Sequence, residues 1–409
     1  MRMLPDPILY IIFSYIPIQD RWQISRVCRQ WYSVLHDPYL YQHIVLRDIE
    51  FKQLLLSMKK LIHISPFIKS ITMDGCYSDF IRTTIVSVPF SNSSCDVPPL
   101  YTHIRNLEVD RRRQEYKNHG YNLHQKFSNY FSQLMALKGS TITSLCIINC
   151  RLDFEMTELF CIIICAGHKL TSFYYENNDD QGIESPQLLQ TLVMSTPNMR
   201  HFCGRHAGMN DVVLGTISRR WLSLETLTLY NLGKEDNSEG DNRNTLANIS
   251  HQAFLELLCQ CKELRSLELY DLACITNRDV ALYNKEIERL KTKSKTRYQP
   301  YPEKGAEWRP GGSVCQLRIT KYNTTPLSMP GFHDLLRLFP NLVRLEYVTN
   351  FNTFYNQFEG VTLELFEAEK ASIDCLMKSK SLIYEGRWYE PMTAEQYLTA
   401  GLLRSLGAY

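Results

Sequence analysis

The chain has 409 residues, which is enough for more than one domain with a sizeable core. Charged residues make up 22% of it and the formal net charge is +2, so no overall field favours nucleic acid or a membrane surface. No apolar run reaches the roughly 18 residues of a membrane-spanning helix. Prolines near the N-terminus interrupt the apolar segment, whereas a signal peptide would need an uninterrupted one. Thirteen cysteines without a secretion signal indicate reduced thiols, and we expect a protein of the cytoplasm or nucleus.

The first predicted unit is helical and spans residues 1–48. Asp6 is placed to cap a helix that begins at Pro7, where a missing N–H has no consequence. Apolar residues then recur at helical spacing on one broad face. A second helix is expected from Asp20, with Gln23 in the capping-box position. Three short helices cannot bury all of these apolar side chains among themselves, so the segment needs a partner.

Short motifs in this segment occur at characteristic spacings: Leu4-Pro5, Ile8-Leu9, Tyr15-Ile16-Pro17, Asp20, Val27-Cys28-Arg29, Trp31, Asp37-Pro38 and Leu40. Together they resemble an F-box, the helical motif that docks on the Skp-family adaptor of a cullin-type ubiquitin ligase. Pro7 departs from the family, which often has an acidic residue there. The alternative is an ordinary helical cap on a larger fold, which would not need this combination. The resemblance implies that the adaptor contacts Leu4, Pro5, Ile8, Ile12, Ile24, Val27, Cys28 and Trp31.

From about residue 64 a repeated apolar pattern takes over, in which one apolar residue is followed by a second three positions on and a third two beyond. This is the strand pattern of a leucine-rich repeat. Segments with helical periodicity lie between the copies, over residues 123–137, 186–194, 251–259 and 330–338. A single repeat cannot bury its apolar face alone, so neighbours should stack into a solenoid. The copies begin at Ile68, Ile104, Ile142, Leu170, Met199, Leu224, Leu264, Val314 and Leu342.

The predicted fold class is therefore α/β. A three-helix F-box precedes an irregular leucine-rich-repeat solenoid with a parallel sheet on its concave face. We expect the F-box at residues 1–48, the solenoid at 49–361 and a helical cap at 362–409, because no strand pattern was found after residue 361. The copy at Leu264 is similar to the cysteine-containing repeats of leucine-rich F-box proteins. Two polar segments, residues 233–244 and 291–312, are predicted to be mobile excursions.

The sequence contains no recognisable catalytic or metal-binding motif. It has no G-x-S-x-G, no phosphate-binding loop and no H-E-x-x-H. Close cysteine pairs such as Cys161 and Cys165 lack the C-x-x-C spacing, and cysteine in an apolar helix packs as a small apolar residue. Basic runs at residues 111–113 and 285–304 could contact phosphates, but solvated loops explain them better. We therefore predict no enzyme, no cofactor, no metal and no nucleic-acid partner.

Side chains alternate along a strand, so residues between the repeated apolar positions should point to the concave face. That face is the usual binding surface of a solenoid, and Tyr and Arg are frequent interface hot spots. The alternative is that the tyrosines simply cover neighbouring strands, as cross-strand aromatic pairs do. The candidate partner-binding residues are Tyr174, Tyr230, Glu268, Tyr270, Arg318, Arg344 and Glu346.

The resemblance implies a substrate-recognition subunit of a cullin-type ubiquitin ligase. The F-box would dock the Skp-family adaptor and through it a cullin, while the solenoid binds an unidentified protein for ubiquitination. Such a receptor contributes proximity and orientation, with no catalytic residue of its own. The alternative is a leucine-rich scaffold whose F-box serves a complex that ubiquitinates nothing. Both hypotheses need the same docking surface, so the sequence leaves them open.

Overall fold

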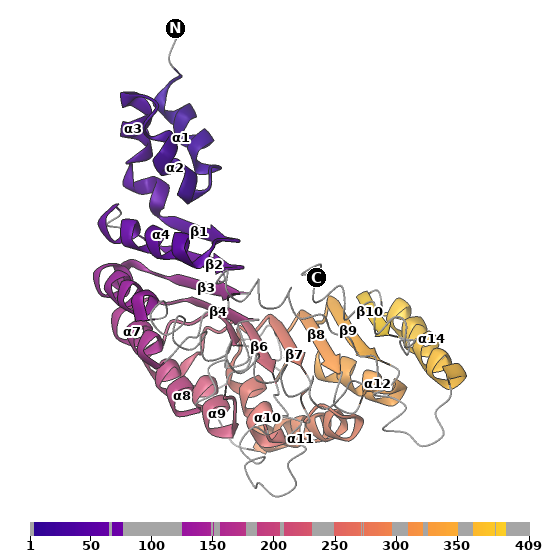
Figure 1. Ribbon diagram of the computed structural model, residues 1–409. Coiled ribbons are helices and arrows are strands. Elements are labelled where there is room, and N and C mark those ends of the chain that lie inside the picture. The colour runs from indigo at the N-terminus through magenta and orange to yellow at the C-terminus, as the bar shows by residue number, and fades with distance from the viewer. Residues whose placement is uncertain are drawn as a thin grey trace, which may run out of the picture. The chain divides into compact units, whose positions relative to one another are not determined.

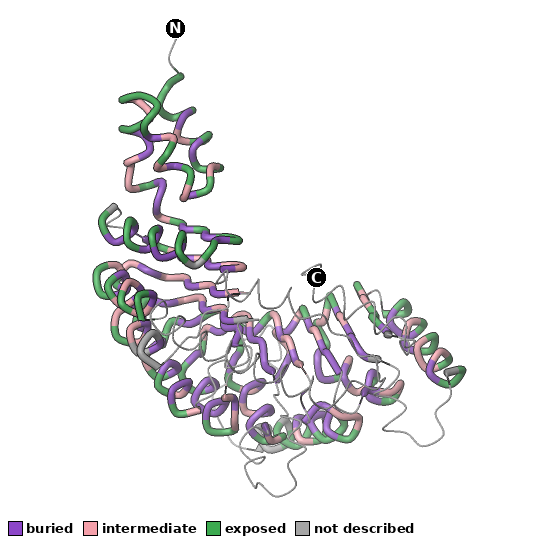
Figure 2. The backbone as a smooth tube through the Cα atoms, viewed as in Figure 1, coloured by how far each residue is buried: buried purple, intermediate pink, exposed green. Residues whose placement is uncertain are grey.

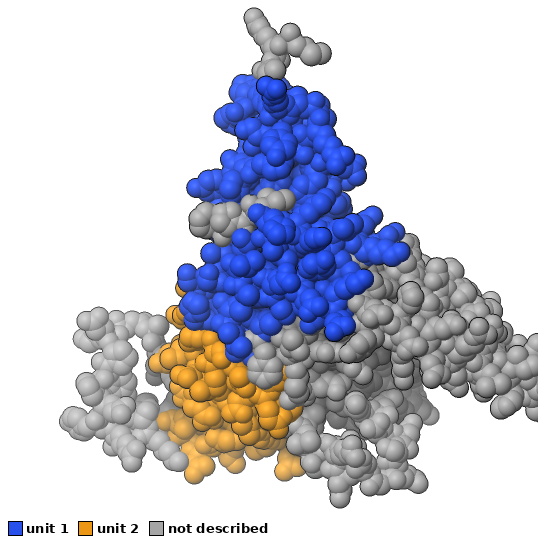
Figure 3. All heavy atoms as spheres, turned by 60° about the vertical axis from the view of Figure 1, so that its left-hand side comes forward, with its two compact units in different colours: residues 1–169, 177–179, 395–409 blue, residues 170–176, 180–394 orange. Residues whose placement is uncertain are grey.

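The computed structural model alternates helices and strands along the chain (Figure 1), and buried residues gather where the two kinds of element meet (Figure 2). The described residues form two compact units, coloured separately in Figure 3. Unit 1 consists of residues 1–169, 177–179 and 395–409, and unit 2 of residues 170–176 and 180–394. The structure describes residues 4–64, 68–76, 125–148, 150, 156–176, 186–204, 208–230, 249–270, 272, 274–296, 310–321, 326–350, 363–380 and 382–389.

Unit 1 begins with short helices and continues into parallel strands that pair in chain order. The helices are α1 (Asp6–Ser14), α2 (Ile18–Ile24) and α3 (Arg29–Leu35), followed by the 3-10 helix η1 (Pro38–Tyr41). The strands are β1 (His43–Arg47), β2 (Ser70–Asp74) and β3 (Ser144–Ile148). The remaining elements are α4 (Phe51–Ile64), a helix over residues 125–138, η2 (Gly139–Thr141) and α7 (Met156–Ala166).

In unit 2 each described strand pairs in parallel with the next one along the chain. The helices of this unit lie along one face of its strands (Figure 1). The strands are β4 (Ser172–Glu176), β5 (His201–Gly204), β6 (Thr226–Tyr230), β7 (Ser266–Tyr270), β8 (Gln316–Lys321), β9 (Arg344–Asn350) and β10 (Ile383–Tyr389). The helices are α8 (Pro186–Ser195), α9 (Asp211–Arg220), α10 (His251–Gln260), α11 (Asn277–Thr296), α12 (Met329–Leu338) and α14 (Leu363–Ser379).

The repeated apolar pattern coincides with strands β2 to β9, apart from the copy at Ile104, which lies outside the described residues. Its side chains form the core between strands and helices: Leu224, Leu227 and Leu229, for example, are fully buried. Neighbouring copies are in register, so equivalent side chains stack from strand to strand. The predicted α/β fold is therefore confirmed, with N-terminal helices followed by parallel strands as in a leucine-rich-repeat solenoid.

Two strands occur where the sequence pattern placed none. β1 falls inside the predicted F-box segment, where Tyr41, Ile44 and Leu46 repeat the apolar template and are buried. β10 falls inside the predicted helical cap and pairs with β9. Its pattern is obscured because Gly386 occupies the position opposite the core residue Tyr347 and has no side chain to reveal the face. Residues 390–409 of the predicted helical cap lie outside the described residues.

Helix starts were predicted less well than helices. The helical segments of the repeats are confirmed by α8, α10 and α12, and Ser250 caps α10 by accepting a hydrogen bond from the Ala253 N–H (3.3 Å). The caps predicted at Asp6 and Asp20 are wrong, because α1 and α2 start behind a proline. Proline already fixes the φ angle that the residue before a helix needs. Neither proline provides a side-chain cap.

The segment 291–312, predicted to be mobile, is structured at both described ends. α11 continues to Thr296, and Pro310 and Gly311 are buried. Gly311 has a φ of +72°, and a Cβ there would lie 3.0 Å from the Leu338 carbonyl oxygen, so the turn requires glycine. Residues 297–309 and the predicted loop 233–244 lie outside the described residues. Within the described part of the chain, no helix combines the length and apolarity needed to cross a membrane.

Candidate functional site: two protein-docking surfaces

The first candidate surface is formed by the residues predicted to contact an adaptor, which we name the docking face. Most of its side chains are open to solvent: Ile8 is 45% exposed, Ile12 44% and Val27 64%. Ile24 and Trp31 are half-buried. Apolar side chains exposed together on short helices favour burial against another protein. The docking face comprises Leu4, Pro5, Ile8, Ile12, Ile24, Val27, Cys28 and Trp31.

Helix α1 explains this surface because it has apolar side chains on two sides. Leu9 and Phe13 are buried inside unit 1. On the other side, exposed apolar residues recur three and four positions apart, as on one helix face. Ile11 and Tyr15, which is 85% exposed, belong to this face although the sequence interpretation did not include them. The same spacing would have found them. The exposed apolar side chains of this face are Ile8, Ile11 and Ile12 of α1 and Tyr15, which directly follows the helix.

Two docking-face residues also support the helices themselves. The Trp31 ring meets the buried Phe13 ring edge-on, with centroids 5.2 Å apart and an interplanar angle of 72°. The Cys28 sulfur caps α3 by accepting a hydrogen bond from the Trp31 N–H at 3.5 Å. Substitution of either residue would therefore disturb both the fold and the surface. Leu4 and Ile8, which are exposed, are cleaner probes of docking.

Arg21 of α2 ties this helix to the end of α1 and to η1 from inside. Its Nε donates to the Ile16 carbonyl (2.8 Å), Nη1 to the Leu40 carbonyl (2.6 Å) and Nη2 to the Ser14 carbonyl (3.1 Å). These carbonyls lie at or after the end of α1 and within η1, where helix ends leave backbone oxygens without partners. Burial lowers the pKa of the Arg21 guanidinium, which nevertheless stays charged in proteins. The sequence interpretation missed this residue.

The helices of the docking face are tied to the first repeats of unit 1. The N–H groups of Lys69 and Ser70 both donate to the Gln42 carbonyl, at 2.8 and 3.1 Å, at the start of the paired strands β1 and β2. The Lys60 ammonium of α4 lies 4.2 Å from the centroid of the Trp22 ring of α2, a cation–π contact. Unit 1 therefore presents the docking face on a continuous scaffold of helices and strands.

The second candidate surface lies on the unit 2 strands, on the side that faces away from the buried apolar positions; we name it the polar face. It contains the predicted residues Tyr174 on β4, Tyr230 on β6, Glu268 and Tyr270 on β7, Arg318 on β8, and Arg344 and Glu346 on β9. Tyr230 is buried, Arg344 is exposed and the others are half-buried. Tyr174 lies opposite Cys203 of β5, apart from the other two tyrosines.

An aromatic and cationic stack occupies the middle of the polar face. The rings of Tyr230 and Tyr270, which are opposite each other in register, have centroids 4.1 Å apart and an interplanar angle of 10°. The Arg318 Cζ lies 5.4 Å from the centroid of the Tyr270 ring. Burial by itself would lower the pKa of Arg318, but nearby Tyr270, Glu346 and Glu268 raise it above its usual value. The guanidinium is thus held between an aromatic ring and carboxylates.

Ion pairs continue from this stack to the last strands. Arg318 Nε lies 3.5 Å from Glu346 Oε1, and Arg387 Nη2 lies 3.4 Å from the same oxygen. Arg344 Nη2 lies 2.5 Å from Glu385 Oε1. Arg387 and Glu385 belong to β10 and were missed because that strand was not recognised from the sequence. These cations and carboxylates neutralise one another across the strands.

The stacking of the rings helps to decide whether the tyrosines bind a partner or pack between neighbouring strands. With 8% of its surface exposed, Tyr230 is mostly hidden, and its partner ring comes from the neighbouring strand. This is the geometry of a cross-strand aromatic pair that stabilises a sheet. Tyr270 and Arg344 retain more contact with solvent. The polar face can therefore bind a partner through its partly open residues while Tyr230 serves packing.

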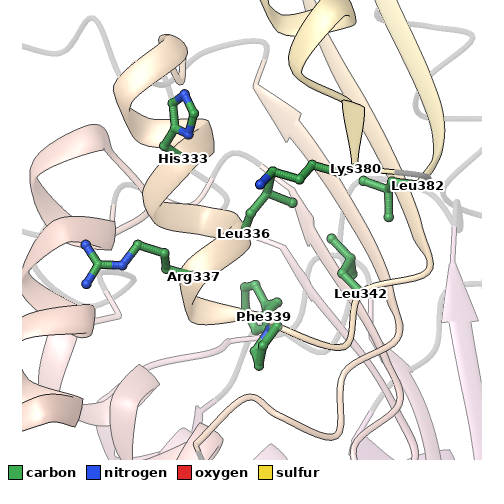
Figure 4. A pocket seen from close by; sticks show the side chains of 8 residues that line it. His333, Leu336, Arg337, Phe339, Leu342, Lys380 and Leu382 are labelled. Carbon is green, nitrogen blue, oxygen red and sulfur yellow. The ribbon is translucent and has the colours of Figure 1, made fainter. Parts of the chain in front are cut away.

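A cavity of about 340 Å³ lies on the helical side of unit 2, where α12 and α14 lead into their strands (Figure 4). His333 and Arg337 come from α12 and Lys380 follows α14. Cations near helix C-termini stabilise the helix dipole, and Arg337 also pairs with Asp334 at 3.7 Å. The charges of Arg337 and Lys380 therefore have a structural explanation. No cluster of metal-ligating side chains occurs among the residues that the structure describes. The cavity is lined by His333, Leu336, Arg337, Phe339, Pro340, Leu342, Lys380 and Leu382.

Comparison with known proteins finds similarity in the N-terminal segment of the chain. Residues 1–47 match the F-box-like family. The F-box/LRR-repeat protein 12 of Bos taurus and that of Homo sapiens are each 49% identical to this chain over 43 residues, as is that of Mus musculus. The match covers 10% of this chain and spans only 13% of each relative. The chain therefore has an F-box-like domain at its N-terminus, and the repeats that follow are identified by their structure.

Proposed function

We propose that this protein is a substrate-recognition subunit of a cullin-type ubiquitin ligase. The docking face binds a Skp-family adaptor, which connects the chain to a cullin. The repeats of unit 2 bind a protein substrate, with the partly open residues of the polar face among its contacts. The chain itself performs no chemical step, because holding a substrate near a ubiquitin-loaded enzyme is sufficient to raise its local concentration. The reaction takes place in the cytoplasm or nucleus.

One observation carries this proposal: an F-box-like segment has exposed apolar side chains on a defined set of short helices. Burial of apolar surface stabilises association by about 25 cal/mol per Å² before the costs of ordering are subtracted. Arg21 and the internal face of α1 already stabilise the helices without the exposed side chains of Ile8 and Ile12. Binding of another protein is the role that accounts for them.

The alternative function is a leucine-rich scaffold that binds the adaptor in a complex without a ligase. It is favoured by the polar face, whose charges are paired with one another and whose tyrosines are stacked. A face whose charges pair with one another can be a structural feature of the repeats alone. Both functions share the docking face, and they differ in whether a cullin accompanies the adaptor.

The test is co-purification from cells that express the tagged chain. The receptor function predicts that both a Skp-family adaptor and a cullin are recovered, and that a ubiquitinated protein accumulates when the proteasome is inhibited. The matched control is the double substitution Leu4→Ala with Ile8→Ala, at exposed positions of the docking face. It should lose adaptor and cullin together. Recovery of the adaptor without any cullin would support the scaffold, and equal recovery by the control would contradict the docking face.

A further inference from the structure

Two buried cysteines lie opposite each other at the ends of neighbouring strands in unit 1. The parallel pairing of β2 and β3 ends with Asp74 opposite Ile148. It continues with a hydrogen bond from the Gly75 N–H to the Ile148 carbonyl at 3.0 Å. Cys76 and Cys150 each follow that last pair by two residues. The register therefore brings the two cysteines together although residues 77–149 separate them in the sequence.

The separation suits a covalent bond between the two sulfurs. Adjacent strands lie about 4.8 Å apart, and a disulfide needs Cα atoms within about 4.4–6.8 Å of each other. The interaction between the two buried thiols lowers the pKa of Cys76 and raises that of Cys150. Cys76 is therefore the more easily ionised partner. Both are reduced in this structure and fully buried.

The alternative is a purely structural role, in which each thiol only donates a hydrogen bond to the backbone. The Cys76 sulfur donates to the Leu46 carbonyl (3.5 Å) and the Cys150 sulfur to the Ile148 carbonyl (3.2 Å), which satisfies backbone oxygens beyond the strands. That role explains a cysteine at each position. It does not require a second cysteine at the matching position of the neighbouring strand. The placement of two buried cysteines in register on adjacent strands is the observation that points to a bond between them.

We propose that Cys76 and Cys150 form a reversible disulfide, which makes unit 1 a redox-sensitive part of the protein. The oxidant is a peroxide, small enough to reach a buried thiol during local opening. The Cys76 thiolate attacks hydrogen peroxide, which gives a sulfenic acid and releases hydroxide. The Cys150 sulfur then attacks the Cys76 sulfur, so that the S–S bond forms and water leaves. Two thiols and one peroxide thus become one disulfide and two waters.

This bond would cross-link the second and third strands beside the docking-face helices of the same unit. Closing a long loop restricts the unfolded chain more than the folded one and raises stability. The inference does not depend on the proposed ligase function, because it concerns only the chemistry and stability of unit 1. A dithiol reductant should reverse it, since thiol–disulfide exchange returns both cysteines to thiols.

The experiment treats the purified, fully reduced chain with hydrogen peroxide, blocks remaining thiols and maps cross-linked peptides by mass spectrometry. We expect one dominant peptide pair containing Cys76 and Cys150, a mass loss of two hydrogens, and a melting temperature higher by about 5 °C or more. Reduction should reverse the mass loss and the thermal shift. Cys76→Ser and Cys150→Ser should each abolish both.

The matched control is Cys261→Ser, at a buried thiol of unit 2 that donates to the Trp221 carbonyl. It should retain the cross-link and the thermal shift. Oxidation of Cys76 to a sulfinic acid without a cross-link, or a dominant disulfide between other cysteines, would overturn the proposal. The peptide map of the unsubstituted chain decides this even if a serine variant fails to fold.

Discussion

The docking face of unit 1 and the polar face of unit 2 differ in how their side chains are satisfied. On the docking face, Ile8, Ile12 and Val27 are apolar and open to solvent. On the polar face, Tyr230 stacks on Tyr270, and Arg318 pairs with Glu346. The docking face leaves apolar side chains in contact with water, which burial against another protein would remove. On the polar face the charged and aromatic side chains already contact one another.

This difference shows which kind of surface can be assigned from structure. An exposed apolar helix face has an unfavourable contact with water, so its burial by a partner is an energetic expectation. A face of paired charges gains little from a partner, because each incoming charge must first replace an existing one. The structure therefore favours partner binding more strongly for the docking face than for the polar face.

The following substitutions test the interactions that stabilise each unit and its surface, beginning with the largest expected effect.

Arg21→Ala should damage the support of the docking face most. It removes three hydrogen bonds to the carbonyls of Ser14, Ile16 and Leu40. Charged hydrogen bonds contribute about 1.5–3 kcal/mol each, and buried carbonyls left without partners add to the loss, so unit 1 should lose about 3–5 kcal/mol. Chemical denaturation measures the effect. Arg26→Ala, at an exposed position of the same segment, should change it little, and equal losses would contradict this role for Arg21.

The interior of unit 2 should respond to alkaline pH through Cys261. Burial raises the pKa of this thiol from 9.0 to about 12, so the unfolded chain releases the proton first. Its contribution to stability is complete below pH 9 and is lost as pH rises toward 12, at about 1.4 kcal/mol per pH unit. Cys261→Ala should show a correspondingly shallower fall in denaturation experiments. Cys375→Ala, at an exposed thiol, should follow the unsubstituted protein.

The tyrosine stack of the polar face should show a measurable coupling. A double-mutant cycle of Tyr230→Ala and Tyr270→Ala should give an interaction free energy of about 1 kcal/mol, as aromatic pairs do. Tyr174, which lies opposite Cys203, gives the matched cycle with Tyr270 and should show almost none. Substrate capture measured on the same variants separates the two roles of the tyrosines. A coupling near zero would mean that the stack does not stabilise the sheet.

Arg344→Ala should have the smallest effect on stability. Its ion pair with Glu385 lies between side chains that are 49% and 39% exposed, where solvent screening leaves about 0.5 kcal/mol or less. If the polar face binds the substrate, this exposed arginine can still affect capture. A loss of capture with unchanged thermal stability would assign it to binding. Unchanged capture would shift recognition away from this end of the face.

The sequence predicted the repeats well because burial imposes a strict spacing on them. Leu264, Leu267 and Leu269 are all in the core, as the pattern requires. The pattern failed at β10 because Gly386 has no side chain at the position in register with the core residue Tyr347. The ion-pair partners Arg387 and Glu385 were missed with that strand. Periodicity also cannot show that Tyr230 and Tyr270 stack, since register and rotamer decide that contact.

The docking face was predicted from motif residues, and α1 shows why the motif has this form. One side of the helix contributes Leu9 and Phe13 to the core, while the other retains Ile8 and Ile12 at the surface. Arg21 could not be predicted as an internal support, because its role depends on three carbonyls that only the folded helix ends bring together. The spacing of residues in the sequence does not show which backbone carbonyls come near the Arg21 side chain.

The most direct measurement is the affinity of the chain for a purified Skp-family adaptor, by calorimetry, with Ile8→Asp combined with Ile12→Asp. Two carboxylates placed in an apolar interface should weaken binding by at least about 100-fold, while the melting temperature changes little because both positions are exposed. Leu56→Asp, at an exposed leucine of α4, is the matched control and should bind nearly as the unsubstituted chain does. Unchanged affinity of the double variant would contradict the docking face.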